Sequence, residues 1–243
     1  MREIKKIKNM NLIEVYQDTL DYSKHLLNSN TTKHSFSEIL KNQLKTKTNI
    51  EVVNSDSVSA LTKWSKLGKT AVLNMASHKR PGGGVINGAR AQEECLFRCS
   101  NLGHVISTDF YPLQDDELLW TKDVVFFKDV SYGYMKDVNV DVITIAAPNL
   151  NGLGKFQKIP NYEELTKNKI RLMLSMAIKN NIENIILGAW GCGVFGNEPN
   201  KMAKMFGDVI NEGYSFDNII FAIINDHNSV GNNYNEFKSI VGV

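Results

Sequence analysis

The sequence lacks a long apolar run. No stretch of its 243 residues approaches the ~20 consecutive apolar residues that a membrane helix needs. The first residues, Met1–Lys6, lead into polar sequence and not into the apolar core of a signal peptide. We therefore expect a cytoplasmic protein with no membrane association.

Cysteine is scarce as well. Cys95, Cys99 and Cys192 are an odd number without the spacing of a disulfide framework, which fits a reducing compartment. Cys95 and Cys99 are one helical turn apart, but two thiols need further ligands to hold a metal, and none is adjacent in the sequence. A buried helix face is the better interpretation, and we expect neither a metal nor a cofactor.

A strong charge of either sign is also missing. The 28 Lys and Arg residues nearly balance the 26 Asp and Glu residues, which leaves a net charge of +2. Such a balance gives little global attraction to nucleic acid, so no sequence-specific nucleic-acid binding is expected. The length suits one large domain, or one domain with a small extension, and a monomer is expected.

The most informative segment lies between residues 81 and 94. Three successive glycines follow an apolar run, can adopt positive φ angles and let a ligand approach the peptide N–H groups, which suits an oligophosphate or a crowded sugar. After a seven-residue spacer, a Gln-Glu-Glu trio offers an amide and two carboxyls for proton transfer. Alone, the glycines could form a tight turn and the glutamates a solvated helix face. Together they indicate a phosphorylated sugar beside an acid/base, formed by Gly82, Gly83, Gly84, Gln92, Glu93 and Glu94.

A second glycine-rich segment, residues 188–197, reads G-A-W-G-C-G-V-F-G-N and also follows an apolar strand. Loops after parallel strands meet at the carboxyl edge of a sheet, so the two segments should lie together. A pyrophosphate could be clamped between them by backbone N–H groups and by the positive end of a helix beginning near Pro199. Phosphate binding of this kind does not need many lysines.

Together, these motifs resemble the microbial type of poly(ADP-ribose) glycohydrolase, whose catalytic domain is a macrodomain. The glycine triplet, the spacer and the Gln-Glu-Glu trio look like the family's signature, and residues 188–197 look like its diphosphate loop. Leu73–Ser77 is similar to the segment that enters the ribose pocket in macrodomains, although Ser77 stands where relatives often carry Asn. The likeness covers about residues 50–228.

The resemblance implies hydrolysis of ribose–ribose O-glycosidic bonds in poly(ADP-ribose), mainly from chain ends, with release of ADP-ribose. It implies that Glu94 protonates the departing ribose oxygen and that Glu93 hydrogen-bonds a neighbouring sugar hydroxyl. A proton donor at neutral pH needs a raised pKa, which the adjacent carboxylate and partial burial should give Glu94. The expected substrate-binding residues are Asn74, Ser77, Gly82, Gly83, Gly84, Val85, Gln92, Gly191, Cys192, Gly193, Val194, Phe195 and Gly196. Asp56, Asp226 and Asn228 are candidates for the adenine end, or else cap and turn residues.

Strand and helix signals alternate from residue 49 onward, which implies a mostly parallel sheet layered between helices. The resemblance implies, more specifically, a three-layer α/β/α macrodomain with a mixed, mostly parallel central sheet, over residues 49–243. Strands are predicted at Ile50–Asn54, Ala71–Met75, Val124–Phe127, Val142–Ala146, Ile185–Leu187 and Ile219–Ile224. Helices are predicted at Asp56–Lys66, Gly88–Leu102, Tyr162–Lys179, Pro199–Asn211 and Asn232–Ile240.

Residues 1–48 form an N-terminal helical extension in this interpretation. The pattern predicts amphipathic helices at about Asn11–Leu27 and about Ser35–Lys45, joined by the polar Asn28–Thr32. The segment is mildly basic, with nine Lys and Arg against five Asp and Glu. Solvated helix faces explain this, and contact with a phosphate-rich polymer is the alternative.

Three other functions compete with polymer hydrolysis. Gly191, Gly193 and Gly196 match the dinucleotide fingerprint G-x-G-x-x-G, but they lie in the last quarter of the chain, where an early βαβ unit and a nearby acidic strand end are lacking. A macrodomain that only binds ADP-ribose, without catalysis, would not need the paired glutamates. Removal of single ADP-ribose units from protein or nucleic acid would use the same pocket on another leaving group.

Overall fold

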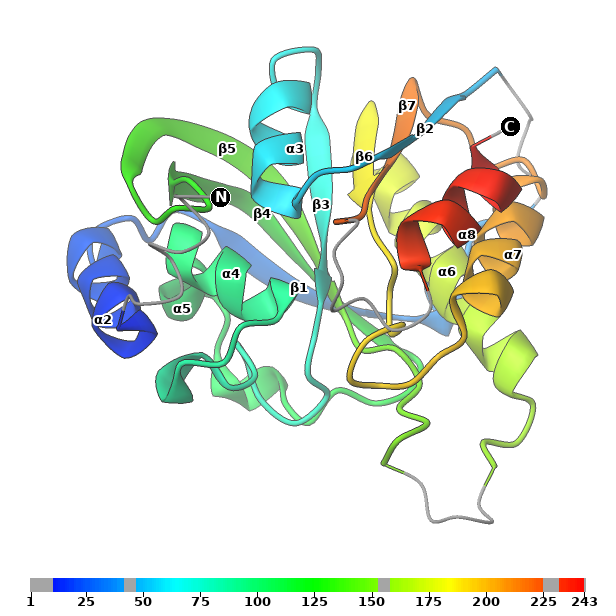
Figure 1. The fold of residues 1–243 in the computed structure, drawn as a ribbon, viewed down its shortest axis with the longest axis horizontal. Coiled ribbons are helices and arrows are strands. Elements are labelled where there is room, and N and C mark those ends of the chain that lie inside the picture. The colour runs from blue at the N-terminus through cyan, green and yellow to red at the C-terminus, as the bar shows by residue number, and fades with distance from the viewer. Residues whose placement is uncertain (1–10, 42–46, 153–157, 225–231, 243) are drawn as a thin grey trace.

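A seven-stranded sheet forms the centre of the computed structural model, which describes residues 11–41, 47–152, 158–224 and 232–242 (Figure 1). The strand order across the sheet is β1-β4-β5-β3-β6-β7-β2. The strands are β1 Asn30–Ser35, β2 Asn49–Val53, β3 Thr70–Met75, β4 Glu117–Lys128, β5 Tyr134–Ile145, β6 Asn184–Leu187 and β7 Asn218–Ala222.

Most of the strand pairs are parallel. β5, β3, β6, β7 and β2 run in one direction, whereas β4 is antiparallel to both of its neighbours, β1 and β5. The predicted mixed, mostly parallel sheet is thus confirmed. Since the five parallel strands end at the same edge, the loops that follow them meet there.

Helices cover both faces of the sheet. One face carries α2 Leu12–Ser23, α3 Ser57–Trp64, α4 Gln92–Cys99 and α5 Leu102–Val105, and the other carries α6 Tyr162–Lys179, α7 Pro199–Ile210 and α8 Asn233–Val241 (Figure 1). Short 3₁₀ turns occupy Phe36–Glu38, Val85–Asn87 and Thr108–Phe110. The predicted three-layer α/β/α architecture is confirmed.

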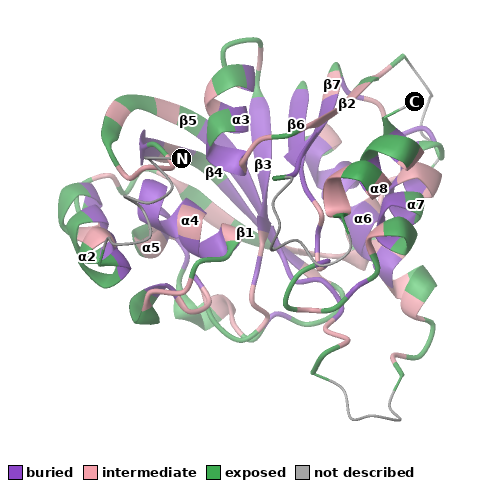
Figure 2. Cartoon of the chain, in the orientation of Figure 1, coloured by how far each residue is buried: buried purple, intermediate pink, exposed green. Residues whose placement is uncertain are grey.

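Two apolar clusters, one on each face, bury the central strands completely (Figure 2). Ile185 and Leu187 of β6 point into the cluster under α6, α7 and α8, whereas Ile186 points into the cluster under α3 and α4. Successive strand residues face opposite sides, so a strand covered on both faces must be apolar throughout. This is why β3, β6 and β7 were readable as short apolar runs.

The N-terminal segment differs from its prediction. The first predicted helix is confirmed as α2, but the helix predicted at about Ser35–Lys45 is wrong: Asn30–Ser35 is strand β1 and Phe36–Glu38 a 3₁₀ turn. β1 pairs with β4 over six residues, and Thr31 Oγ1 lies 3.0 Å from Thr121 Oγ1 across the pair. Residues 42–46 lie outside the described ranges. A boundary between an extension and a catalytic domain at residue 48 stays a prediction.

Two further predictions differ from the structure in where the helix or strand begins and ends. The helix predicted at Gly88–Leu102 is confined to α4, because Gly88 has a φ of +75° and ends a 3₁₀ turn. β4 and β5 extend well beyond their predicted cores and form a long hairpin. Helix α6 has the bounds predicted for it. In the part of the chain that the structure describes, no helix has the length and apolar character needed to cross a membrane.

Candidate active site

The glycine triplet folds over the two glutamate side chains. Gly82 and Gly83 have φ angles of +69° and +52°, which side chains other than glycine rarely adopt. A Cβ on Gly83 would lie only 2.8 Å from Glu94 Oε1 and 2.9 Å from Glu93 Oε2. Glycine is therefore required here so that the main chain can approach both carboxyl groups.

Glu93 is buried at the start of α4, with 3% of its surface exposed. Its Oε2 accepts a hydrogen bond from the Ser77 N–H at 2.7 Å. Its Oε1 accepts from the Gly82 N–H at 3.2 Å and from Asn74 Nδ2 at 3.4 Å. The end of β3 and the first glycine of the loop thus fix this carboxyl from two sides.

The pKa of Glu93 is raised to about 8, because burial and the negative charge of Glu94 raise it more than the hydrogen bonds from Ser77, Asn74 and Gly82 lower it. Desolvation is the largest of these effects. The folded state therefore favours the protonated form of Glu93. The raised pKa expected for Glu94 stays a prediction.

Glu94 is held differently. Its Oε1 accepts a hydrogen bond from the Gly84 N–H at 2.9 Å. Its Oε2 is buried, and none of the described residues hydrogen-bonds it. A buried carboxyl oxygen without a partner is costly, which points to a partner supplied by a ligand. The first glycine loop therefore uses the N–H groups of Gly82 and Gly84 to hold the glutamates, which leaves phosphate binding to other groups.

The Gln92 side chain joins three elements. Its Oε1 accepts from the Met75 N–H at 3.0 Å, and its Nε2 donates to Leu73 O at 2.6 Å and to Ser57 Oγ at 3.1 Å. The amide thereby ties α4 to the end of β3 and to the start of α3. The sequence suggested contact with the ribose or the glycine loop, and the structure adds this bracing role.

The second glycine loop supplies free donors. The N–H groups of Gly193, Val194 and Phe195 have no acceptor among the described residues. The Phe195 carbonyl accepts from the N–H groups of Leu150 and Asn151, which anchors the loop to residues 150 and 151. Successive free N–H groups form a concave anion site, and α7 begins a few residues later at Pro199.

A cavity of about 370 Å³ separates the two loops. Glu93, Glu94 and Gly83 line one side, and Gly193 and Phe195 line the other. The Phe195 ring stands edge-on to His78, with their centroids 6.5 Å apart. The residues that the sequence placed at one edge of the sheet are brought together around this space.

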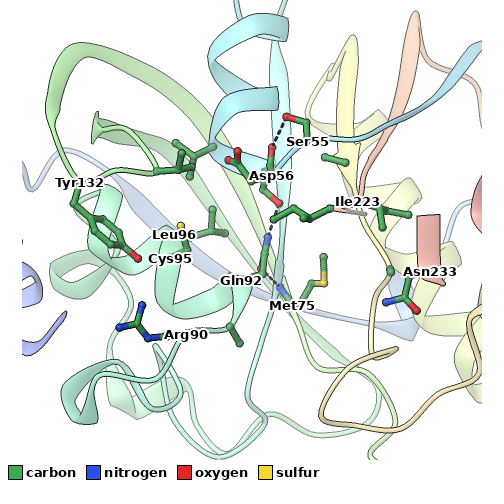
Figure 3. Close-up of a pocket in the computed structure, with 17 residues that line it drawn as sticks. Ser55, Asp56, Met75, Arg90, Gln92, Cys95, Leu96, Tyr132, Ile223 and Asn233 are labelled. Atoms are coloured by element: carbon green, nitrogen blue, oxygen red, sulfur yellow. Dashed lines mark hydrogen bonds between the residues drawn. The ribbon is translucent and has the colours of Figure 1, made fainter. Parts of the chain in front are cut away.

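A second cavity of about 370 Å³ shares Met75, Gln92 and Asn233 with the first, along with Ala91 and Ala189. Figure 3 shows the side chains that line this second cavity. Asp56, one of the candidates for the adenine end, lies in its wall, where its Oδ1 also caps α3 by accepting from the Ser59 N–H at 2.8 Å. We call these two cavities together the groove; the glutamates line the first cavity, and Asp56 lines the second.

The structure separates the expected substrate-binding residues into two groups. Those that line the cavities are Ser77, Gly83, Gln92, Glu93, Glu94, Gly191, Gly193, Val194 and Phe195. Those that line neither cavity are Asn74, Gly82, Gly84, Val85, Cys192 and Gly196. Members of the second group hold the glutamates or the loops; Asn74, for example, is fully buried behind Glu93. Asp226 and Asn228 lie outside the described residues.

Other wall residues carried no signal in the sequence. Arg90 and Tyr132 lie in the wall of the second cavity, on the side away from Asn233 (Figure 3). Tyr111, which lines neither cavity, has a buried hydroxyl with no partner among the described residues, and burial together with the charge of Glu93 raises its pKa. These side chains come from loops far apart in the chain, so only the fold reveals them.

Comparisons with known proteins point to one family. The family model described as the microbial-type PARG catalytic domain, where PARG is poly(ADP-ribose) glycohydrolase, matches residues 4–132. A search of curated proteins found no significant match.

Solved structures of the same kind superpose over most of the chain. A poly(ADP-ribose) glycohydrolase from Thermomonospora curvata bound to the inhibitor ADP-HPD is 23% identical with a TM-score of 0.83, over 94% of this chain and 98% of that one. A poly(ADP-ribose) glycohydrolase from Deinococcus radiodurans in complex with ADP-ribose is 26% identical with a TM-score of 0.78, over 86% of this chain and 93% of that one.

Proposed function

The chain belongs to the microbial-type PARG catalytic domain family, and from this premise we propose that Glu94 is the general acid/base with which it hydrolyses ribose–ribose bonds in poly(ADP-ribose). The observation that carries the assignment is the buried, unpartnered Oε2 of Glu94 beside the cavity. Its other oxygen is already engaged by Gly84. One oxygen orients the group, and the other would form the contact with the sugar.

The chemistry needs a proton donor at the glycosidic oxygen. Cleavage passes through an oxocarbenium-like state, in which protonation of the leaving ribose oxygen and nearby negative charge both lower the barrier. Glu94 Oε2 would give that proton and then receive one from the attacking water. Glu93, whose pKa burial raises to about 8, would hold the neighbouring sugar hydroxyl.

The remaining parts of ADP-ribose would follow the groove. The free N–H groups of Gly193, Val194 and Phe195 would take the pyrophosphate, which explains binding by a protein of net charge +2. The Phe195 ring would pack on the terminal ribose. The adenine end would occupy the second cavity near Asp56. The acting form would be a cytoplasmic monomer working from the ends of polymer attached to modified proteins; the three free cysteines fit a reducing compartment.

The test uses purified wild type, Glu94→Gln and Glu93→Gln with labelled polymer and with mono-ADP-ribosylated protein. We expect wild type to release ADP-ribose from polymer, and Glu94→Gln to lose release on the order of 10³-fold while calorimetry finds ADP-ribose binding retained. Glu93→Gln should retain more activity, because the amide can still hydrogen-bond the sugar hydroxyl and Glu94 is unchanged. Undiminished release by Glu94→Gln would refute the assignment. Release from the mono-modified protein alone would redefine the substrate.

A further inference from the structure

Arg98 is a buried charge without a carboxylate partner. Its side chain is fully buried in the last turn of α4, and no Asp or Glu of the described ranges forms an ion pair with it. The guanidinium instead donates to three backbone carbonyls: Nε to Leu12 O at 3.1 Å, and Nη2 to Ala89 O at 2.7 Å and to Val85 O at 3.4 Å. Burying an unpaired cation is costly. A fold that keeps one gains something specific from its geometry.

Two of these carbonyls belong to the spacer between the glycines and the glutamates. The spacer is folded back on itself, because the Ala89 N–H donates to Gly84 O at 3.2 Å and the Gly88 N–H donates to Val85 O at 3.1 Å. Holding Val85 and Ala89 therefore fixes Gly84 as well. Gly84 is the residue whose N–H orients Glu94.

The third carbonyl belongs to the N-terminal helix. Leu12 is the first residue of α2. About two turns further along this helix, Thr19 Oγ1 donates to the Arg98 carbonyl at 2.6 Å. Thr19 in turn accepts from Lys128 Nζ at 2.9 Å, and the same Nζ binds Asp18 at 2.6 Å. Arg98 is thus held between α2 and the catalytic loop, with hydrogen bonds to both.

We propose that Arg98 is a positioning residue, which couples the docking of α2 to the conformation of the glycine loop and so keeps the Gly84 N–H on Glu94. The inference rests on the proposed role of Glu94. It gives residues 11–23 a task in the enzyme: they complete the support of the acid/base, although none of them lines either cavity. A planar fork is needed because the acceptors lie on two different segments, which a lysine ammonium could not reach in the same arrangement.

Arg98→Lys tests the coupling, because it keeps the charge and removes the fork. We expect kcat to fall on the order of tenfold or more, with the affinity for ADP-ribose changed by no more than about twofold, since the groups that hold substrate are not touched. Hydrogen exchange at the Gly84 amide should become faster. Thr19→Val, which removes one hydroxyl of the α2 contact, should change kcat and this exchange in the same direction by a smaller factor.

A matched control separates positioning from general loss of stability. Phe237→Leu thins the apolar cluster on the opposite face of the sheet, far from the loop. At equal loss of melting temperature, this control should keep kcat and Gly84 exchange near wild type. Equal kcat in Arg98→Lys and the control, with unchanged Gly84 exchange, would overturn the proposal. If Arg98→Lys does not fold, Thr19→Val decides, and wild-type values there also overturn it. Since exchange is measured without substrate, failure of the proposed activity would be distinguishable from failure of this coupling.

Discussion

The Gly84 N–H hydrogen-bonds Glu94 Oε1 at 2.9 Å, whereas the other oxygen of the same carboxyl, Oε2, is buried with no partner among the described residues. The two oxygens of one side chain are thereby made unequal. The engaged oxygen sets the orientation of the group, and the unengaged one is left for chemistry. Because the donor is a backbone group, the glycine loop orients the Glu94 carboxyl and does not only line the substrate cavity.

Gly83→Ala should inactivate the enzyme more than it destabilises it. The new Cβ would come within 2.9 Å of carboxyl oxygens of both Glu93 and Glu94, so these side chains must move. We expect kcat to fall on the order of 10²-fold, because displacements near 1 Å have effects of that size. The positive φ of +52° should cost about 1–2 kcal/mol of unfolding free energy. Release of ADP-ribose from polymer and chemical unfolding measure the two effects.

The control for that substitution is Gly133→Ala in the β4–β5 hairpin. A Cβ there would meet its nearest atom at 3.5 Å, which is ordinary contact, and Gly133 lines neither cavity. Its kcat should equal that of wild type. Wild-type kcat in Gly83→Ala as well would mean that the glutamates tolerate displacement, which contradicts the assigned geometry.

Ionisation of Glu93 should lower the unfolding free energy of the protein as pH rises. Its pKa is about 8 in the folded state, above the ordinary carboxyl value of 4.5, mainly because of burial. The folded state therefore binds more protons than the unfolded state between these values, and the unfolding free energy decreases with pH. The stabilisation is complete below about pH 4.5 and is lost as pH passes 8. Over that window the loss should be on the order of a few kcal/mol.

The measurement compares denaturant unfolding of wild type and Glu93→Gln between pH 5 and 9. The amide cannot ionise, so the unfolding free energy of the variant should fall less than that of wild type over this range. At alkaline pH the variant should therefore gain stability relative to wild type. Parallel curves would show that Glu93 ionises normally in the folded protein.

Local sequence was enough to predict the helices and strands whose own apolar pattern is regular. Helix α6 was predicted at its observed bounds because its apolar spacing is regular and because Glu163, Glu164 and a closing Lys179 suit the helix dipole. The apolar strands β3 and β6 were visible for a similar reason, since both faces are buried. The glycine and glutamate motifs were close enough in the chain to indicate a site.

The pairing of strands far apart in the chain and the folding of the first glycine loop could not be predicted from the sequence. β1 has the sequence N-T-T-K-H-S, with no fully buried residue, and becomes a strand only because β4 offers a hydrogen-bonding edge. The expectation that the first glycine loop presents its N–H groups to phosphate missed their use by Glu93 and Glu94, which depends on how the spacer folds. Arg98 gave no signal either, because its acceptors are backbone carbonyls.

Gln92→Glu should destabilise the fold. The substitution replaces a donor that lies 2.6 Å from Leu73 O with a carboxylate oxygen, so that two acceptors face each other and Ser57 Oγ loses the N–H that donates to it. The expected loss is about 1–3 kcal/mol of unfolding free energy. Gln114→Glu, at an exposed loop position, is the matched control and should change stability by less than about 0.5 kcal/mol. Equal stabilities of the two variants would show that the Gln92 bridge adds nothing to the fold.

Two alanine substitutions in the second glycine loop should have opposite effects. A Cβ on Gly193 would meet no atom within 4 Å and would extend into open space, so Gly193→Ala should unfold like wild type but bind ADP-ribose on the order of tenfold more weakly, because the methyl group occupies space beside the free N–H groups. Gly196 has a φ of +72°, and its Cβ would lie 2.5 Å from Asn151 Oδ1, so Gly196→Ala should lose about 1–2 kcal/mol of stability. Calorimetric titration with ADP-ribose and denaturant unfolding separate the two effects. Wild-type affinity in Gly193→Ala would show that the pyrophosphate lies elsewhere, since no ligand seated on these N–H groups could ignore an added methyl.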